Sequence, residues 1–282
     1  MLGSPVAHSL SPALHRAAYA KLGLDGWSYQ AIECDEAGLP GLLGSLDGGW
    51  AGLSLTMPLK RAVIGLLDRV SPLAADVGAV NTVIFGRPAG RNGPELSGYN
   101  TDVGGMADAL AGPLARTSPA LAGALIVGGG ATACSALAAL RQLGLRKATV
   151  AVRAPGRAGE LLAAADRLGI PVAVTGVDSL GSTGGAGDLS GGLVVSTVPS
   201  GAADQLAGPL SSLGAAAVLD VVYDPWPTRL AVVAREAGAA VIGGFELLLY
   251  QAARQVRLMT GLEPPVEAMR AEGLAELARR GH

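Results

Sequence analysis

Residues Ala124 to Ala133 read ALIVGGGATA and run directly into the apolar segment CSALAALRQLG. A short apolar run ended by three glycines predicts a buried strand followed by a tight turn. The run from Gly128 to Ala133 fits the pattern G-x-G-x-x-G/A, in which the second glycine lets backbone approach a pyrophosphate and the last small residue lets helix and strand pack closely. The following helix presents its N-terminus to negative charge. The stretch therefore predicts a dinucleotide site at Gly128, Gly129, Gly130 and Ala131.

The next predicted strand runs from Lys147 to Arg153. The basic turn at its end indicates which dinucleotide binds. Proteins that bind NAD usually carry an acidic residue about 20 positions beyond the glycines, which holds the ribose 2′-hydroxyl. Here Arg153 and Arg157 stand in that turn, and the strand end carries no carboxylate. Guanidinium groups grip a 2′-phosphate through paired hydrogen bonds. We expect NADP(H); the alternative is that both arginines are solvated loop residues.

Strands and helices alternate around this unit, which predicts βαβ units, a parallel sheet and the α/β class. We expect strands at 123–130, 147–153, 171–177, 191–199, 216–225 and 239–244, helices at 131–144, 156–169 and 228–238, and a surface loop at 182–192. The first hundred residues predict a different arrangement, with helices at 11–24 and 59–70 and strands at 27–34, 50–58, 78–85 and 96–102. Two further helices are expected at 245–261 and 264–280.

Composition limits the possible partners. The 282 residues are 50% hydrophobic but only 4% aromatic, and the formal charge is −2. No basic stretch resembles a surface that tracks phosphates, so nucleic acid is not expected. Apolar runs are interrupted before they reach membrane-spanning length. Two cysteines, Cys34 and Cys134, form neither a disulfide framework nor a metal site, so we expect a cytoplasmic protein without a metal.

Three short stretches outside the dinucleotide unit carry candidate chemistry. Lys60 lies in the first turn of a predicted helix, where the helix dipole disfavours a cation and so suits proton transfer; the alternative is a surface lysine. Asn81 interrupts an apolar strand, so its amide needs a partner, which could be neighbouring backbone. Asp102 ends a strand ahead of a helix, where it could simply be an N-cap. Ser9 could likewise cap the helix that begins at Ser11.

Eight segments in order identify the chain as similar to the shikimate dehydrogenases. They are SPVAHSLSPALH (from Ser4), SLTMPLK (from Ser54), GAVNT (from Gly78), GYNTD (from Gly98), VGGGATA (from Val127), VVSTVP (from Val194), DVVYDPWPT (from Asp220) and YQAARQ (from Tyr250). The resemblance covers nearly the whole chain. It implies NADP-dependent, reversible reduction of 3-dehydroshikimate to shikimate in aromatic amino-acid biosynthesis. It also implies a substrate domain built from residues 1–102 and 243–282, and a Rossmann-type NADP-binding domain from 103–242.

The resemblance also assigns roles by position. Lys60 and Asp102 match the catalytic pair, and Ser9 and Ser11 match the hydroxyls that bind the substrate carboxylate. The other implied substrate-binding residues are Thr56, Asn81, Tyr223 and Gln251. The implied cofactor-binding residues are those of the glycine turn, Gly128 to Ala131, together with Arg153, Arg157, Thr197 and Gly244.

The chain departs from the family pattern at four places. Ser54 stands where Asn is usual, Cys134 stands where Arg is frequent, and Arg153 is flanked by Val152 and Ala154 where Asn and Thr are usual. The run from Glu246 to Tyr250 replaces one that usually contains Met-Leu.

Three rival functions are also considered. The rivals are a quinate/shikimate dehydrogenase with relaxed or NAD use, an enzyme acting on an aminated shikimate, and a non-catalytic NADP-binding paralogue. An acidic residue at position 153 would mark NAD selectivity, and loss of Lys60 or Asp102 would mark the paralogue. We expect a monomer or a homodimer.

Overall fold

The computed structural model describes residues 1–86, 94–117, 123–180, 189 and 191–281. Its contacts divide the chain into two compact units, residues 1–101 with 249–281, and residues 102–248. The second unit is one continuous stretch, whereas the first takes its parts from both ends of the chain. The return crossing falls inside helix α10 (Gly244–Thr260), instead of just before it as the sequence predicted.

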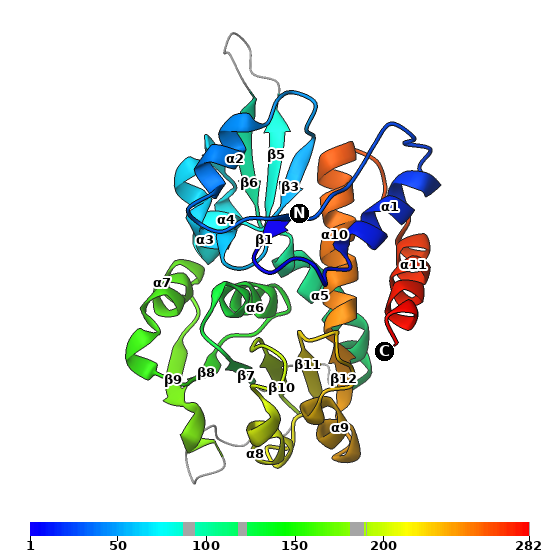
Figure 1. Ribbon diagram of the computed structural model, residues 1–282. Coiled ribbons are helices and arrows are strands. Elements are labelled where there is room, and N and C mark those ends of the chain that lie inside the picture. Colours follow the sequence, from blue (N-terminus) through cyan, green and yellow to red (C-terminus); the bar gives the residue numbers. More distant parts are fainter. Residues whose placement is uncertain (87–93, 118–122, 181–188, 190, 282) are drawn as a thin grey trace. The chain divides into compact units, whose positions relative to one another are not determined.

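A six-stranded parallel sheet forms the centre of the second unit (Figure 1). Its strand order is β12-β11-β10-β7-β8-β9. Residues such as Leu125, Ile126 and Val194 are fully buried, as expected for a sheet covered by helices on both faces. The strands are β7 (Ala124–Val127), β8 (Ala148–Val152), β9 (Val172–Gly176), β10 (Leu193–Ser196), β11 (Ala217–Asp220) and β12 (Ala240–Gly243).

The helices of this unit form two groups. One group packs α5 (Asp102–Thr117), α6 (Ala131–Gln142) and α7 (Gly159–Leu168) side by side, and the other pairs α8 (Ala207–Ser211) with α9 (Arg229–Glu236). Right-handed crossovers running in opposite directions from the middle of the sheet place the groups on opposite faces. This is the doubly wound α/β arrangement, whose ligand crevice lies at the carboxyl ends of the strands. Short 3₁₀ turns lie at η2 (Pro155–Arg157), η3 (Val177–Ser179) and η4 (Asp204–Leu206).

The first unit contains a mixed sheet and helices from both chain ends. Strands β3 (Gly52–Ser54), β5 (Thr82–Gly86), β6 (Glu95–Tyr99) and β4 (Arg69–Val70) are neighbours in that order. Strand β1 (Leu2–Gly3) pairs in parallel with β2 (Ile32–Glu33), and a parallel bridge between Leu2 and Leu55 joins it to the end of β3. The helices are α1 (Ser11–Lys21), α2 (Leu39–Ser45), α3 (Leu59–Ala62), α4 (Pro72–Val77), α10 and α11 (Val266–Arg279), with a 3₁₀ turn η1 (Ile64–Leu66). Helices α1 and α11 pack together.

Several expected elements differ from the structure. The predicted helix at 59–70 is wrong in its second half, because α3 and η1 are followed by the strand Arg69–Val70, which pairs with β6. The strand expected at 27–34 is confined to Ile32–Glu33, and helices α2 and α4 were not predicted. Most of the loop expected at 182–192 lies outside the described residues. Within the described ranges, no helix has both the length and the apolar composition needed to cross a membrane.

Candidate active site

The loop before α1 carries the two candidate serines. The N-cap residue of α1 is Leu10 and not Ser9, although the Ser9 Oγ accepts a hydrogen bond from the Ser11 N–H at 3.2 Å. Arg280, just after α11, donates to the carbonyl of His8 at 2.8 Å and to that of Ser9 at 3.4 Å. The guanidinium therefore ties the serine loop to the C-terminal end of the chain.

A buried histidine and tyrosine lie beneath this loop. The Nδ1 of His15 is 2.9 Å from the carbonyl oxygen of Ser11, and the His15 ring stacks on Tyr29 with centroids 4.0 Å apart. Burial lowers the pKa of His15 to about 3, so the ring is neutral. A neutral, stacked imidazole held by backbone is a structural group.

The Tyr29 hydroxyl begins a chain of buried hydrogen bonds. It donates to the Ser54 Oγ at 2.7 Å, and the Ser54 hydroxyl donates to Gln255 Oε1 at 2.9 Å. Gln255 in turn donates from Nε2 to the Thr82 Oγ at 3.1 Å. Ser54, which departs from the family pattern, is therefore a link between β3 and α10.

A second cluster surrounds Asn81 at the start of β5. Asn81 Oδ1 accepts from the Thr101 N–H at 2.8 Å and from the Thr82 hydroxyl at 2.9 Å. Its Nδ2 donates to the Thr101 Oγ at 2.9 Å and to Gln251 Oε1 at 3.4 Å. The amide is thus held by side chains as well as backbone, and the cluster joins Asn81 to the candidate Gln251.

Thr56 and Lys60 lie where β3 turns into α3. The Thr56 N–H donates to the carbonyl of Leu2 at 2.9 Å. The carbonyl of Lys60 accepts from the Val80 N–H at 2.8 Å, so the backbone that carries Lys60 lies beside the residue before Asn81. Helix α3 has only four residues, so the helix dipole that we invoked for Lys60 is small, because it sums over aligned peptides.

Asp102, Tyr223 and Gly244 belong to the second unit. Asp102 is the first residue of α5 and is buried. Tyr223 is half-buried in the loop after β11. A Cβ at Gly244 would collide with the carbonyl of Val221, so glycine is required there by the chain's own packing.

Asp220 anchors the loop that carries Tyr223. Its carboxylate accepts from the Thr228 hydroxyl at 2.7 Å and from the Val222 N–H at 3.3 Å. Desolvation by burial raises the pKa of this carboxyl, and the bonds from Thr228 and Val222 oppose the rise. Thr228 also caps α9, so one buried carboxylate orders both ends of the loop.

Gly128 and Gly130 of the glycine turn are glycines for different reasons. Gly128 has φ +115°, and a Cβ there would collide with the Thr197 Oγ. The Thr197 hydroxyl itself donates to the carbonyl of Val127 at 2.8 Å, so this candidate shapes the turn. Gly130 has φ −83°, and a Cβ added there would meet no atom of the described residues within 4 Å. The packing of the described residues therefore does not require glycine at position 130. Close approach of a ligand phosphate to the backbone would require it.

Arg153 and Arg157 are exposed in the turn after β8. Arg153 follows the strand directly, and Arg157 ends η2. No carboxylate in the described part of the chain forms an ion pair with either guanidinium. Both remain available for an anionic ligand. Ala131 begins α6 at the same carboxyl edge of the sheet, which is the ligand-binding edge of this fold.

Four residues with site contacts were missed by sequence reasoning: Tyr29, Thr101, Gln255 and Arg280. Thr101 and Gln255 lie in quoted motifs, GYNTD and YQAARQ, so their neighbourhood was visible. Tyr29 and Arg280 carry no local signal, because their partners are distant in sequence.

Comparison with known proteins identifies the family of the chain. A family profile described as the shikimate dehydrogenase substrate binding domain matches residues 1–83, and one for the shikimate 5′-dehydrogenase C-terminal domain matches residues 244–272. A shikimate dehydrogenase (NADP(+)) of Thermus thermophilus is 39% identical over 287 residues, covering 99% of this chain and 97% of the relative. The crystal structure of the Mycobacterium tuberculosis enzyme aligns with TM-score 0.81 at 38% identity, covering 97% of both chains. A Thermus thermophilus crystal structure in complex with NADP(H) and shikimate aligns with TM-score 0.76 at 35% identity over 97% of both chains. The chain therefore belongs to the shikimate dehydrogenase family.

Proposed function

We propose that this protein is an NADP-dependent shikimate dehydrogenase, which interconverts 3-dehydroshikimate and shikimate. The observation that carries the proposal is the buried cluster of Asn81, Thr101 and Gln251, built beside the backbone of Lys60. A ring with several hydroxyls needs neutral groups that both donate and accept, and amide and hydroxyl side chains do both. A lysine beside such a cluster supplies the proton that a carbonyl reduction requires.

The cofactor fits the second unit. NADPH, when bound, supplies the hydride. Gly128, Gly129, Gly130 and Ala131 would hold the pyrophosphate at the N-terminus of α6. Arg153 and Arg157 would hold the 2′-phosphate, and the lack of a carboxylate partner for either within the described residues supports this assignment. Thr197 would set the shape of the glycine turn, and Gly244 would support the nicotinamide side of the site together with the Tyr223 loop.

The substrate would be held by hydroxyl and amide groups. We assign its carboxylate to Ser9 and Ser11, whose loop Arg280 fixes. Thr56, Asn81, Gln251 and Tyr223 would contact the remaining oxygens. For Asn81 and Gln251 to bind the ligand, the hydrogen bond between these two side chains must break. That bond is 3.4 Å long, longer than the bonds from Asn81 to Thr101, so it is the weaker contact.

Lys60 and Asp102 would move the proton. As the carbonyl carbon accepts a hydride, its oxygen gains negative charge, and the Lys60 ammonium donates a proton to that oxygen to give the hydroxyl of shikimate. In the reverse direction the Lys60 amine takes the hydroxyl proton. We assign Asp102 as the second member of the catalytic pair. We place this reaction in the cytoplasm, where two buried, free cysteines and a reduced cofactor are stable.

A coupled set of assays tests the proposal. Absorbance of the reduced nicotinamide is followed with shikimate or quinate as substrate, each with NADP+ or NAD+. We expect the highest kcat/KM with shikimate and NADP+. Lys60→Ala should lower kcat by about 10²-fold or more, the range for loss of a general acid–base group, with shikimate binding measured separately by calorimetry. Higher kcat/KM with quinate and NAD+ would overturn the assignment.

Arg153→Ala tests the cofactor assignment. It should raise the Kd for NADPH by about tenfold or more and change the Kd for NADH little, because only NADPH carries the 2′-phosphate. The exposed Arg146, two residues before β8, provides the control substitution, Arg146→Ala. Equal effects of Arg153→Ala on both cofactors would show that this side chain is merely solvated.

A further inference from the structure

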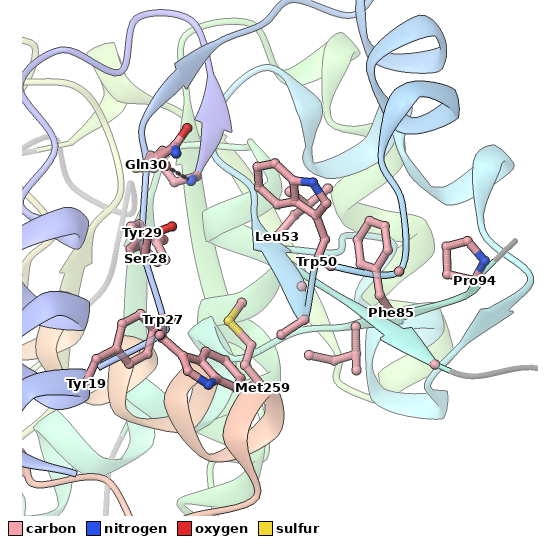
Figure 2. Close-up of a pocket in the computed structure, with 18 residues that line it drawn as sticks. Tyr19, Trp27, Ser28, Tyr29, Gln30, Trp50, Leu53, Phe85, Pro94 and Met259 are labelled. Atoms are coloured by element: carbon pink, nitrogen blue, oxygen red, sulfur yellow. Dashed lines mark hydrogen bonds between the residues drawn. The ribbon is translucent and has the colours of Figure 1, made fainter. Parts of the chain in front are cut away.

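Gln255 is a buried side chain of α10 that is not among the residues assigned to substrate or cofactor. Only 1% of it is exposed. It lies one helical turn before Met259, which lines an open cavity together with Tyr29 (Figure 2). Residues four apart share a helix face, so Gln255 faces the same side of α10 as Met259. A buried amide has donors and acceptors to satisfy, and its partners decide what it does there.

A backbone carbonyl fixes the orientation of the Gln255 amide. The Gln255 Nε2 lies 3.4 Å from the carbonyl oxygen of Asn81 and 3.1 Å from the Thr82 Oγ. A carbonyl oxygen can only accept a hydrogen bond, so the atom that faces it must be the amide nitrogen. The Oε1 atom therefore points the other way, towards Ser54. The amide thus presents a donor to β5 and an acceptor to β3.

The acceptor side of Gln255 sets the direction of a chain of hydroxyl groups. Because Oε1 can only accept, the Ser54 hydroxyl donates to it, at 2.9 Å, and the Ser54 oxygen accepts the Tyr29 proton at 2.7 Å. The Tyr29 hydroxyl is also hydrogen-bonded to the side chain of Ser11. Since the Tyr29 proton is committed to Ser54, the Tyr29 oxygen accepts the proton of Ser11. This acceptor arm ends at a serine that we assigned to the substrate carboxylate.

The donor side of Gln255 leads to the amide cluster. The Thr82 Oγ accepts from Gln255, and the Thr82 proton is donated to Asn81 Oδ1 at 2.9 Å. The same Oδ1 accepts from the Thr101 N–H at 2.8 Å. The Asn81 Nδ2 therefore faces Gln251 Oε1. This donor arm ends at two amides that we assigned to the substrate.

The two arms meet only at Gln255. The hydroxyl protons of Ser54 and Thr82 can rotate, so either group can donate in more than one direction. The donor and the acceptor of one amide are fixed relative to each other, so Gln255 makes Ser54 donate and Thr82 accept at the same time. Ser54 stands where Asn is usual in the family pattern, and here the amide that meets this strand comes from α10.

We propose that Gln255 is a positioning residue for shikimate, which orders the groups that bind its carboxylate and its ring oxygens. The proposal rests on the proposed function, because Ser11, Asn81 and Gln251 are assigned there to the substrate. Without the Gln255 amide, the hydroxyl groups of both arms would have several orientations, and the substrate would have to order them as it binds. Substrate binding would weaken, whereas proton transfer by Lys60, which belongs to neither arm, would continue at a similar rate.

Gln255→Met tests the proposal, because methionine has a similar length and makes neither of the two hydrogen bonds. We expect the KM for shikimate to rise by about fivefold or more, the effect of one or two buried hydrogen bonds. The kcat and the KM for NADP+ should stay within about twofold of the wild type. Val256→Ala is the control, since Val256 is fully buried on the same helix and belongs to neither arm. It should lower the Tm and leave the KM for shikimate within about twofold of the wild type.

A double-mutant cycle tests whether the donor arm acts as a chain. Thr82→Val keeps the shape of the side chain and removes the hydroxyl between Gln255 and Asn81. Because the two substitutions interrupt the same arm, the KM of the double variant should lie well below the value expected from multiplying the two single effects. Fully multiplicative effects would overturn the proposal.

A measurement without turnover separates this proposal from the proposed function. Exchange of the Asn81 side-chain amide protons with water, followed by NMR, should be about fivefold faster or more in Gln255→Met and nearly unchanged in Val256→Ala. If the wild type does not turn over shikimate, the proposed function fails, and the exchange measurement still decides whether Gln255 orders the donor arm.

Three results would overturn the positioning role. One is an unchanged KM for shikimate in Gln255→Met, and a second is unchanged exchange at Asn81. The third is an equal rise in KM in Val256→Ala, which would show that KM follows stability alone. If Gln255→Met does not fold, Ser54→Ala and Thr82→Val each interrupt one arm, and a normal KM in both would overturn the role as well.

Discussion

At the scale of single residues, His15 links pH to stability. Its folded pKa of about 3 lies far below its ordinary value of 6.5. Below pH 6.5 the unfolded chain binds a proton at His15 that the folded chain does not bind. The stability from this group is therefore complete above pH 6.5 and is lost as pH falls towards 3.

Replacement of His15 should remove that dependence. Between about pH 6 and pH 4, the difference in unfolding free energy between the wild type and His15→Gln should shrink by about 1.4 kcal/mol per pH unit. Urea unfolding at each pH measures it. His8→Gln, in the exposed part of the same loop, is the control and should keep the wild-type slope. A difference that does not change with pH would contradict the buried, neutral state of His15.

Tyr29 begins the buried chain of hydrogen bonds that runs through Ser54 to Gln255. Tyr29→Phe removes the donor to Ser54 and should lower the unfolding free energy by about 1–3 kcal/mol, the cost of an unpaired buried polar group. Because Ser54 leads to Gln255, the KM for shikimate should rise more than kcat falls. Urea unfolding and steady-state kinetics measure the two effects. Tyr19→Phe, whose ring packs against Trp27, is the control and should leave the unfolding free energy and the KM for shikimate nearly unchanged. Equal losses in the two variants would show that ring packing, and not the Tyr29 hydroxyl, causes the effect.

At the scale of elements, the turn between β7 and α6 contains glycines that serve different purposes, one for the fold and one for ligand binding. Gly128→Ala places a side chain at φ +115° against Thr197 and should destabilise the fold by about 1–3 kcal/mol. Gly130→Ala meets no atom of the described residues, so stability should be kept or slightly raised, while NADPH binding weakens. Thermal unfolding and NADPH titration of both variants check this. Normal NADPH affinity in Gly130→Ala would show that no phosphate approaches that backbone.

The segment after α3 illustrates how an element can be assigned wrongly. Residues 59–70 have apolar positions at helical spacing, which led us to predict one helix. Strand β6 offers Arg69 and Val70 a ladder partner, and the Asp68 carboxylate accepts the N–H of Leu96 at 2.9 Å. Tertiary pairing overrides local propensity over such a short stretch.

At the scale of the whole molecule, continuity of the chain predicts which unit folds alone. Residues 102–248 contain an entire sheet and its own buried core, including Leu125, Val194 and Leu210. Expressed alone, this fragment should unfold cooperatively and bind NADPH. Residues 1–101 alone lack Gln255 and α11, on which Ser54 and α1 depend, and should not unfold cooperatively. Circular dichroism and NADPH fluorescence distinguish the fragments; a non-cooperative 102–248 fragment would contradict this division.

The sequence by itself determined the α/β class, the glycine turn and the arginines beyond it. Each of these signals is local: an apolar strand, its turn and the following helix lie within about 30 residues, so one segment contains the whole physical constraint. The motifs around Lys60, Asn81, Asp102 and Gln251 were recognisable for the same reason, although only as separate pieces.

Tertiary structure alone decided how distant pieces meet. Asn81 bonds to Gln251 across 170 positions, Ser54 to Gln255 across 201, and Arg280 to His8 across 272. Local pattern does not specify such pairs, because the free energy that forms them comes from packing both chain ends around one sheet and burying their polar groups together.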